Sequence, residues 1–96
     1  MPDDKLYLPE HFDGTNVSQV AAELLTRRGQ PVKLSGGRVK TAGALGFQVL
    51  ASAAKQWLAD DHPFQVVDAS DELFHASEVL GLAQADLGFV ARRVAP

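Results

Sequence analysis

The spacing of apolar residues changes several times along the chain, and each change predicts a new element. Strand side chains point alternately to two faces, so short alternating or continuous apolar runs favour strands. Such runs lie at 5–8, 31–35 and 64–67. Apolar residues spaced three or four positions apart share one face of a helix. They predict helices at 16–28, 42–59 and 70–80.

Residues at the ends of these segments are typical of helix termini. Thr15 or Asn16 is expected to cap the first helix by accepting a backbone N–H, and Gly29 is a natural residue just after it. Ser70 is the expected N-cap of the third helix, which Gly81 should end. In that helix we expect an apolar face turned to the core, made of Leu73, Phe74, Ala76, Val79 and Leu80.

The second helix has the broadest apolar stripe. The stripe contains Ala42, Leu45, Val49, Leu50, Ala53, Ala54, Trp57 and Leu58. Trp57 is expected to pack in the core or at its edge, with a role as a partner anchor as the alternative, because Trp is enriched at interface hot spots. Phe47 lies off the stripe, so we expect it to be partly exposed.

The order is strand, helix, strand, helix, strand, helix. Strands joined by helical crossovers are normally parallel neighbours with right-handed connections. The sequence therefore predicts an α/β layer fold with a mostly parallel central sheet and helices packed on it. We expect a single domain over 1–96, with a core at about 5–82. Residues 83–96 form a C-terminal extension, in which Leu87, Phe89, Val90 and Val94 either add a short strand or pack as a tail.

Composition narrows the class of protein. The net charge of −3 lacks the dense positive face that nucleic-acid binding requires. The chain has no cysteine, which excludes disulfides and thiol catalysis. No apolar run approaches the roughly 20 residues of a membrane span, and MPDDKLYLPE lacks the apolar core of a signal peptide. We therefore expect a cytoplasmic protein with no nucleic-acid partner and no direct membrane insertion.

The segment VKTAGALGF, residues 39–47, is the strongest candidate for a site, since loops at the carboxyl ends of parallel strands usually hold α/β sites. It matches neither the dinucleotide motif G-x-G-x-x-G nor the phosphate loop G-x-x-x-x-G-K-[ST]. Thr41 has two interpretations: an N-cap of the following helix, or a phosphoacceptor and partner-contact residue. A phosphate on Thr41 would lie at the positive end of a helix dipole, near unpaired amides and beside Lys40.

No catalytic or metal-binding pattern is recognised elsewhere. His11, His62 and His75 lie on different elements without the spacing of metal ligands. The serines have no identifiable activating histidine and acid. We expect no enzymatic activity, no metal and no cofactor.

Three stretches together resemble a STAS domain, the fold of sulfate transporter tails and anti-sigma factor antagonists. They are LPEHFDGTNVSQVAAELL, PVKLSGGRVKTAGALGFQVLASAAKQW and FQVVDASDELFHASEVLGL. Phosphorylatable members carry an acid, two hydroxyl residues, glycine and an apolar residue before the second helix. Here Lys40 replaces the acid, Thr41 matches the first hydroxyl, and Ala42 stands at the usual phosphoacceptor position, followed by Gly43 and Ala44.

The resemblance implies a non-enzymatic regulatory module that binds another protein through this loop and helix start. The expected contact residues are Lys40, Thr41, Ala42, Gly43, Ala44 and Phe47, with Thr41 as the candidate phosphoacceptor. The implied partner is an anti-sigma or histidine-kinase-like protein, or a chemotaxis component, since the run from Gly43 to Leu50 is similar to STAS proteins of chemotaxis systems. The alternatives are an accessory subunit that docks on the ATPase of a phospholipid-trafficking ABC transporter, and a small-ligand domain for a nucleotide or lipid.

Overall fold

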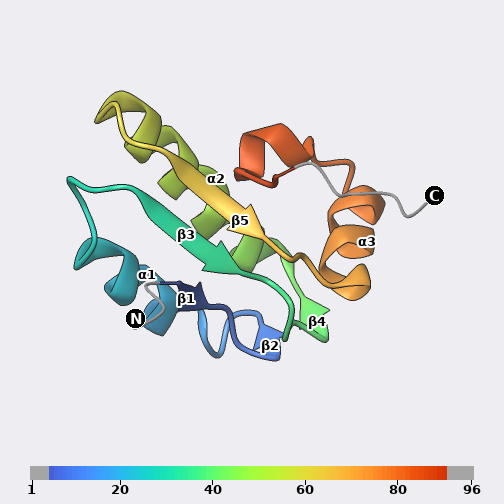
Figure 1. Cartoon of the computed structure of the whole chain (residues 1–96). Helices are drawn as coiled ribbons and strands as arrows, with labels where there is room; N and C mark the ends of the chain where they lie inside the picture. Colours follow the sequence, from blue (N-terminus) through green and yellow to red (C-terminus); the bar gives the residue numbers. More distant parts are fainter. Residues whose placement is uncertain (1–4, 91–96) are drawn as a thin grey trace.

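The computed structural model describes residues 5–90 and contains alternating strands and helices (Figure 1). The elements are β1 (Leu6–Tyr7), β2 (His11–Phe12), α1 (Val17–Leu25), β3 (Val32–Ser35), β4 (Thr41–Ala42), α2 (Ala44–Ala59), β5 (Phe64–Val67), α3 (Asp71–Val79) and a 3₁₀ helix, η1 (Gln84–Leu87). Every predicted strand and helix is present, and the ends differ by a few residues.

The central sheet has the order β1-β3-β5, and both strand pairs are parallel (Figure 1). Leu6 pairs with Leu34, which in turn pairs with Val66. Helix α1 leads from the β1 side to β3, and α2 leads from the β3 side to β5. The predicted α/β fold with parallel neighbouring strands is therefore confirmed.

A second sheet of two short strands was not predicted. In it, β2 and β4 pair in parallel, with His11 opposite Thr41 and Phe12 opposite Ala42. This pairing holds the end of the loop after β3 against the loop after β1, and thereby fixes the segment that the sequence singled out.

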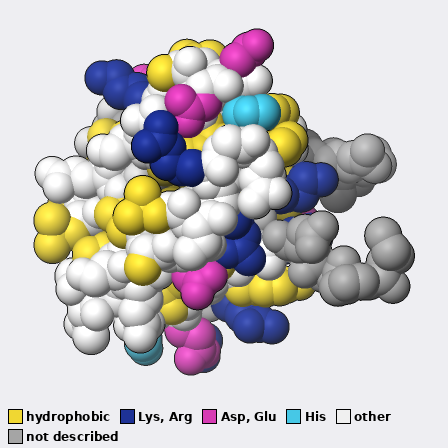
Figure 2. All heavy atoms as spheres, turned by 90° about the vertical axis from the view of Figure 1, so that its left-hand side faces the viewer, with side chains coloured by type: hydrophobic (Ala, Val, Ile, Leu, Met, Phe, Trp, Pro, Cys, Tyr) yellow, Lys and Arg dark blue, Asp and Glu magenta, His cyan; other side chains and the backbone are white. Residues whose placement is uncertain are grey.

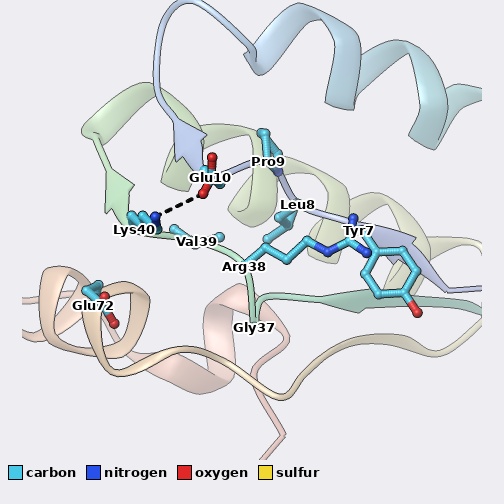
Figure 3. Close-up of a pocket in the computed structure, with 9 residues that line it drawn as sticks. All are labelled: Tyr7, Leu8, Pro9, Glu10, Gly37, Arg38, Val39, Lys40 and Glu72. Carbon is cyan, nitrogen blue, oxygen red and sulfur yellow. Dashed lines mark ion pairs between the residues drawn. The ribbon is translucent and has the colours of Figure 1, made fainter.

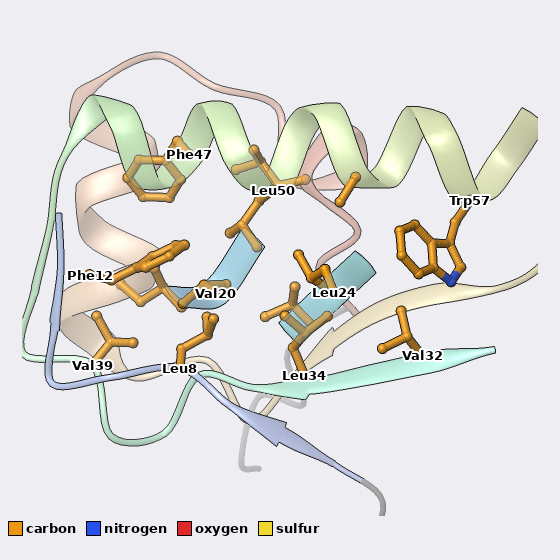
Figure 4. Packing of buried hydrophobic residues seen from close by; sticks show 14 residues of the cluster. Leu8, Phe12, Val20, Leu24, Val32, Leu34, Val39, Phe47, Leu50 and Trp57 are labelled. Carbon is orange, nitrogen blue, oxygen red and sulfur yellow. The ribbon is translucent and has the colours of Figure 1, made fainter. Parts of the chain in front are cut away.

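The core lies between α2 and the central sheet, with α1 closing one side. Alternation along β3 buries Val32 and Leu34 and leaves Lys33 exposed. Figure 4 shows α2 directing Phe47, Leu50 and Trp57 toward these strand residues. The Trp57 indole Nε1 donates a hydrogen bond of 2.8 Å to the Gln30 carbonyl. The core position predicted for Trp57 is thus confirmed.

The ends of α1 and α2 differ from the prediction. Asn16 does precede α1, but its side chain makes no capping bond and instead donates to the His11 carbonyl at 2.6 Å. Helix α1 already ends at Leu25, and Gly29 follows later with φ +84°. The prediction of Thr41 as N-cap of α2 is wrong, because Thr41 belongs to β4 and Gly43 takes the cap position.

Helix α3 begins as predicted and turns a different face inward. The Ser70 hydroxyl accepts the Leu73 amide at 3.0 Å and donates to the Val39 carbonyl at 2.6 Å. Val79 and Leu80 are exposed, so their predicted core positions are wrong. Val79 lies six residues after Leu73, about 240° around the helix, and Leu80 follows its last turn. Buried Ser77 lies on the inner face instead, where its hydroxyl donates to the Phe74 carbonyl at 2.6 Å.

The region after α3 contributes to the core. Leu87 in η1 is buried, and Phe89 forms a parallel bridge with Val66 of β5. Both predicted alternatives for this region therefore occur in part, a packed tail and one strand-like contact. Val94 lies outside the described residues. Between residues 5 and 90, no helix combines the length and apolar character needed to cross a bilayer.

Candidate functional site

The candidate site is built by two loops that follow the carboxyl ends of β1 and β3. The backbone amides of Lys40 and Thr41 both donate to the Glu10 carbonyl, at 2.7 and 3.0 Å. The Gly43 amide donates to the Phe12 carbonyl at 3.1 Å. These bonds fix the backbone of residues 40–43 before any partner binds.

Thr41 is exposed on this fixed backbone, as a contact residue must be. Its hydroxyl oxygen lies 2.9 Å from His11 Nδ1, within hydrogen-bond distance. The amides of Thr41 and Gly43 already donate to carbonyl oxygens, so the expectation that a phosphate on Thr41 would meet unpaired amides is wrong for these two groups. Helix α2 begins three residues later, at Ala44.

Lys40 and Glu10 form an exposed ion pair across the two loops. The Lys40 Nζ lies 3.1 Å from Glu10 Oε1. The hydrogen bond from Lys40 and its positive charge lower the pKa of the Glu10 carboxyl, which is exposed. Lys40 is therefore partnered by an acid from the neighbouring loop.

Phe47 does not contribute to the surface. The prediction of partial exposure is wrong, because its side chain is 2 % exposed and packs in the core. Leu45, which was assigned to the buried stripe, is 52 % exposed instead. The spacing Phe47, Leu50, Trp57 defines the face of α2 that is buried. Leu45 lies about 200° around the helix from Phe47, so it faces away from this buried series and toward the surface.

The exposed part of the predicted site is therefore Lys40, Thr41 and Ala44, extended by Leu45. Ala42 and Gly43 are half-buried between them. We call Lys40, Thr41, Ala44 and Leu45 the docking face. It carries one positive charge, which is paired, one hydroxyl and two apolar side chains.

A charged hollow of about 540 Å³ lies beside this face, between the loops after β1 and β3 (Figure 3). Buried Leu8 and Val39 form part of its lining. The Arg38 guanidinium lies over the Tyr7 ring, 4.4 Å from its centre. Within residues 5–90 Arg38 makes no ion pair. Glu72 of α3 reaches the hollow from the opposite side (Figure 3).

An apolar groove of about 490 Å³ runs between α1 and α2, and we call it the α1–α2 groove. Leu24, Ala53 and Trp57 are its buried members, and the exposed side chains of Leu25 and Leu45 rise at its edges. Figure 2 views the side on which α1 lies in Figure 1, where hydrophobic side chains gather between charged ones. Leu45 belongs to both the groove and the docking face, so the two surfaces are continuous.

The described residues contain no group of three or more His, Asp or Glu side chains placed to hold a metal ion. No family model, curated protein or solved structure matches the chain. The sequence resemblance and the geometry of the docking face, the hollow and the groove are therefore the features that bear on function.

Proposed function

We propose that this protein is a STAS-type regulatory module that acts by binding a partner protein through the docking face. The observation that carries the proposal is Leu45, a large apolar side chain left 52 % exposed directly after the fixed loop that bears Thr41. The buried core of a protein–protein interface is more apolar than the rest of the surface and is depleted in charged residues.

The fixed backbone of residues 40–43 supports this role. Binding costs free energy when loops must become ordered, so a preformed surface retains more of its contact energy. The parallel α/β arrangement also places the face at the carboxyl ends of strands, where such folds usually bind. A standard interface would bury about 800 Å² on this side.

Phosphorylation of Thr41 is the proposed switch. The phosphoryl group would add about two negative charges to an exposed hydroxyl, on a residue that follows Lys40 and precedes the apolar Leu45 by four positions. Desolvating those charges against an apolar partner surface is costly, so the modified face would bind more weakly. The exposed Thr41 side chain is accessible to a kinase without unfolding.

The proposed setting is bacterial signalling, with an anti-sigma or histidine-kinase-like protein or a chemotaxis component as partner. Docking on the ATPase of a phospholipid-trafficking transporter is the alternative setting, and the same face would serve it. Both settings require a surface that binds another protein, and neither requires a catalytic centre.

Affinity purification of the tagged protein from its native host tests the proposal. Co-purifying proteins are quantified by mass spectrometry for the wild type, Thr41→Glu, Leu45→Asp and the control Leu58→Asp. Leu58 is an exposed leucine of the same helix that lies outside the docking face. We expect one partner to be lost at least tenfold with Thr41→Glu and Leu45→Asp and retained with Leu58→Asp. A partner retained by all three variants, or no reproducible partner, would overturn the proposal.

Small-ligand binding is the second candidate function, favoured by the hollow around Arg38. A guanidinium without an ion pair among the described residues, lying over an aromatic ring, suits an anionic planar ligand. Equilibrium dialysis with guanine nucleotides, using a fatty acid as comparison, tests it. Binding that is lost in Arg38→Ala would support this function, and an equal distribution across the membrane would exclude it for these ligands.

A further inference from the structure

The side chains of His11 and Thr41 meet across the small sheet of β2 and β4, where the two residues are paired. His11 Nδ1 lies 2.9 Å from Thr41 Oγ1. The backbone at each position is held by a further contact. The Thr41 amide donates to the Glu10 carbonyl at 3.0 Å. The His11 carbonyl accepts the Asn16 side chain at 2.6 Å. The fold therefore fixes this contact between residues that are 30 positions apart in sequence.

The His11 ring has no partner of opposite charge among the residues that the structure describes. Lys40, another cation at this sheet, already binds Glu10 at 3.1 Å. Asp13, which follows β2, and Glu72 of α3, which packs against β4, add negative charge to the adjoining segments. An anion added to the hydroxyl would therefore have the His11 imidazole within reach, as a group that can become a cation and that no acid already binds.

Phosphorylation would reverse the direction of the hydrogen bond between the two side chains. In the unmodified protein the Thr41 hydroxyl can donate its proton to Nδ1 of a neutral ring. Transfer of a phosphoryl group from a nucleoside triphosphate forms an Oγ–P bond, breaks the bond to the leaving diphosphate and removes this proton. Nδ1 would then face only acceptor oxygens, which is unfavourable unless Nδ1 itself carries a proton. With a protonated ring the contact becomes a charge-assisted hydrogen bond, which is stronger than a neutral one.

We propose that His11 is the phosphate-binding residue of the switch, and that its protonated ring donates from Nδ1 to the phosphoryl group on Thr41. This inference rests on the proposed phosphorylation of Thr41 and names the residue that binds the added group. The phosphoryl group then stays over β2 and β4, and the ion pair between Lys40 and Glu10 is kept.

Phosphorus NMR of the isolated full chain tests the inference. Phosphothreonine is placed at position 41 by genetic code expansion, in the wild-type chain and together with His11→Gln, Lys40→Gln or His62→Gln. A pH titration measures the second pKa of the phosphoryl group, which is ordinarily about 6. Glutamine keeps a hydrogen-bonding side chain and removes the charge. His62 is the control, because it follows the far end of α2, whose 16 residues extend about 24 Å.

We expect the phosphate pKa in the wild-type chain to lie about 0.5–1 unit below that in His11→Gln, because a nearby positive charge favours the doubly charged phosphate. His62→Gln should leave the phosphate pKa unchanged, and Lys40→Gln should change it less than His11→Gln does. Equal phosphate pKa values in the wild-type chain and His11→Gln would overturn the inference. A larger effect of Lys40→Gln would also overturn it, since the lysine would then be the main partner of the phosphate.

A second measurement covers the case in which His11→Gln disturbs the pairing of β2 with β4. In the phosphorylated wild-type chain at neutral pH, the NMR signal of His11 Nδ1 should move toward that of a protonated nitrogen. The ring signals of His62 should stay where they are in the unmodified chain. An unchanged Nδ1 signal would overturn the inference without reference to any substitution.

These measurements use no partner protein, so they separate the inference from the proposed function. A phosphate pKa that depends on His11, together with unchanged partner capture by the phosphorylated chain, would support the inference and overturn the proposed switch. Partner capture that is lost on phosphorylation, together with a phosphate pKa that does not depend on His11, would retain the switch and overturn the inference.

Discussion

At the scale of single residues, Gly46 allows α2 to lie directly on the loop after β1. A Cβ at this position would lie 2.7 Å from the Phe12 carbonyl oxygen and 2.9 Å from a carbon of its ring. Phe12 is fully buried, so neither group can move into solvent. Any larger side chain here must push α2 away from the core.

We predict that Gly46→Ala lowers the free energy of unfolding by about 1–3 kcal/mol, the usual cost of overpacking. The gain in helix propensity, about 1 kcal/mol, offsets part of the strain. Gly43→Ala is the matched control, because Gly43 has φ −116° and the nearest atom to its Cβ would be 3.8 Å away. Urea denaturation followed by circular dichroism measures both. Equal stability of the two variants would contradict the close approach.

The pair of Glu10 and Lys40 gives a prediction about pH. The pKa of the Glu10 carboxyl is lowered in the folded protein by the hydrogen bond and charge of Lys40. The pair therefore stabilises the fold above the ordinary pKa of glutamate, and this contribution is lost as the pH falls through the lowered pKa. Because the pair is exposed, the effect on stability will be small.

We expect Lys40→Met to raise the pKa of Glu10 toward its ordinary value. Arg38→Met, which removes a cation from the same loop, should leave that pKa unchanged, since Arg38 contributes nothing to the shift. Titration of the side-chain carboxyl carbon by NMR measures the pKa in each variant. Identical shifts of the Glu10 pKa in both variants would show that general loop charge, and not the direct contact, lowers it.

Residues of the candidate site were predictable where local sequence decides their position. The N-cap role of Ser70 was predictable because its hydroxyl is followed directly by two acidic residues, and this role is confirmed. The role of Thr41 was missed because its partner, His11, lies 30 residues away in a strand of two residues. Phe47 was predicted to be partly exposed because the apolar stripe of α2 is broad. A broad stripe does not show which of its residues lie at the centre of the buried face.

At the scale of elements, η1 closes the far side of α2 and β5. Leu87 is fully surrounded by the core, although it belongs to a helix of four residues. Gly88 follows with φ +79°, and a Cβ there would lie 2.5 Å from a ring carbon of Phe64. The turn thus brings the chain back along β5, where the Gly88 carbonyl accepts the Val66 amide at 2.8 Å.

We predict that Leu87→Ala lowers the free energy of unfolding by about 2–5 kcal/mol, the range for a leucine removed from a packed core. Leu82→Ala is the control, because Leu82 lies in the same connection and remains partly exposed. Its cost should stay below about 1 kcal/mol. Chemical denaturation distinguishes the two. A small effect of Leu87→Ala would mean that η1 is not required to complete the core in solution.

The central strands and the three helices were predictable because each contains enough residues to show its period. The β2–β4 sheet was not, since two residues cannot display alternation and their partners are remote in sequence. The same limit explains why η1 was not predicted, since its position depends on packing against α2 and not on a sequence pattern of its own.

At the scale of the whole molecule, the docking face and the α1–α2 groove exist because α1 and α2 pack side by side over one sheet. Neither helix alone shows the groove, and its apolar side chains resemble ordinary core positions in the sequence. The order of elements predicts that both helices cross between parallel strands. It does not predict which side chains remain uncovered where the helices meet.

Substitution of the exposed Leu45 can show whether a loss of partner binding comes from the surface or from unfolding. Leu45 lies in the first turn of α2, where no acid is present and where a negative charge favours the helix dipole. We predict that Leu45→Asp changes the free energy of unfolding by less than about 0.5 kcal/mol, because the lost apolar contact and the dipole term offset each other. Leu50→Asp, one turn further on the buried face, should prevent folding, since it places an unpaired charge in the core.

Urea denaturation of both variants measures this difference, with one-dimensional NMR to report the folded state. A stable, folded Leu45→Asp protein makes any loss of partner binding a property of the surface and not of the fold. If Leu45→Asp were destabilised as strongly as a core variant, Leu45 would be packed against its own chain in solution. The docking face would then have to be sought on the remaining exposed residues of the loop, Lys40, Thr41 and Ala44.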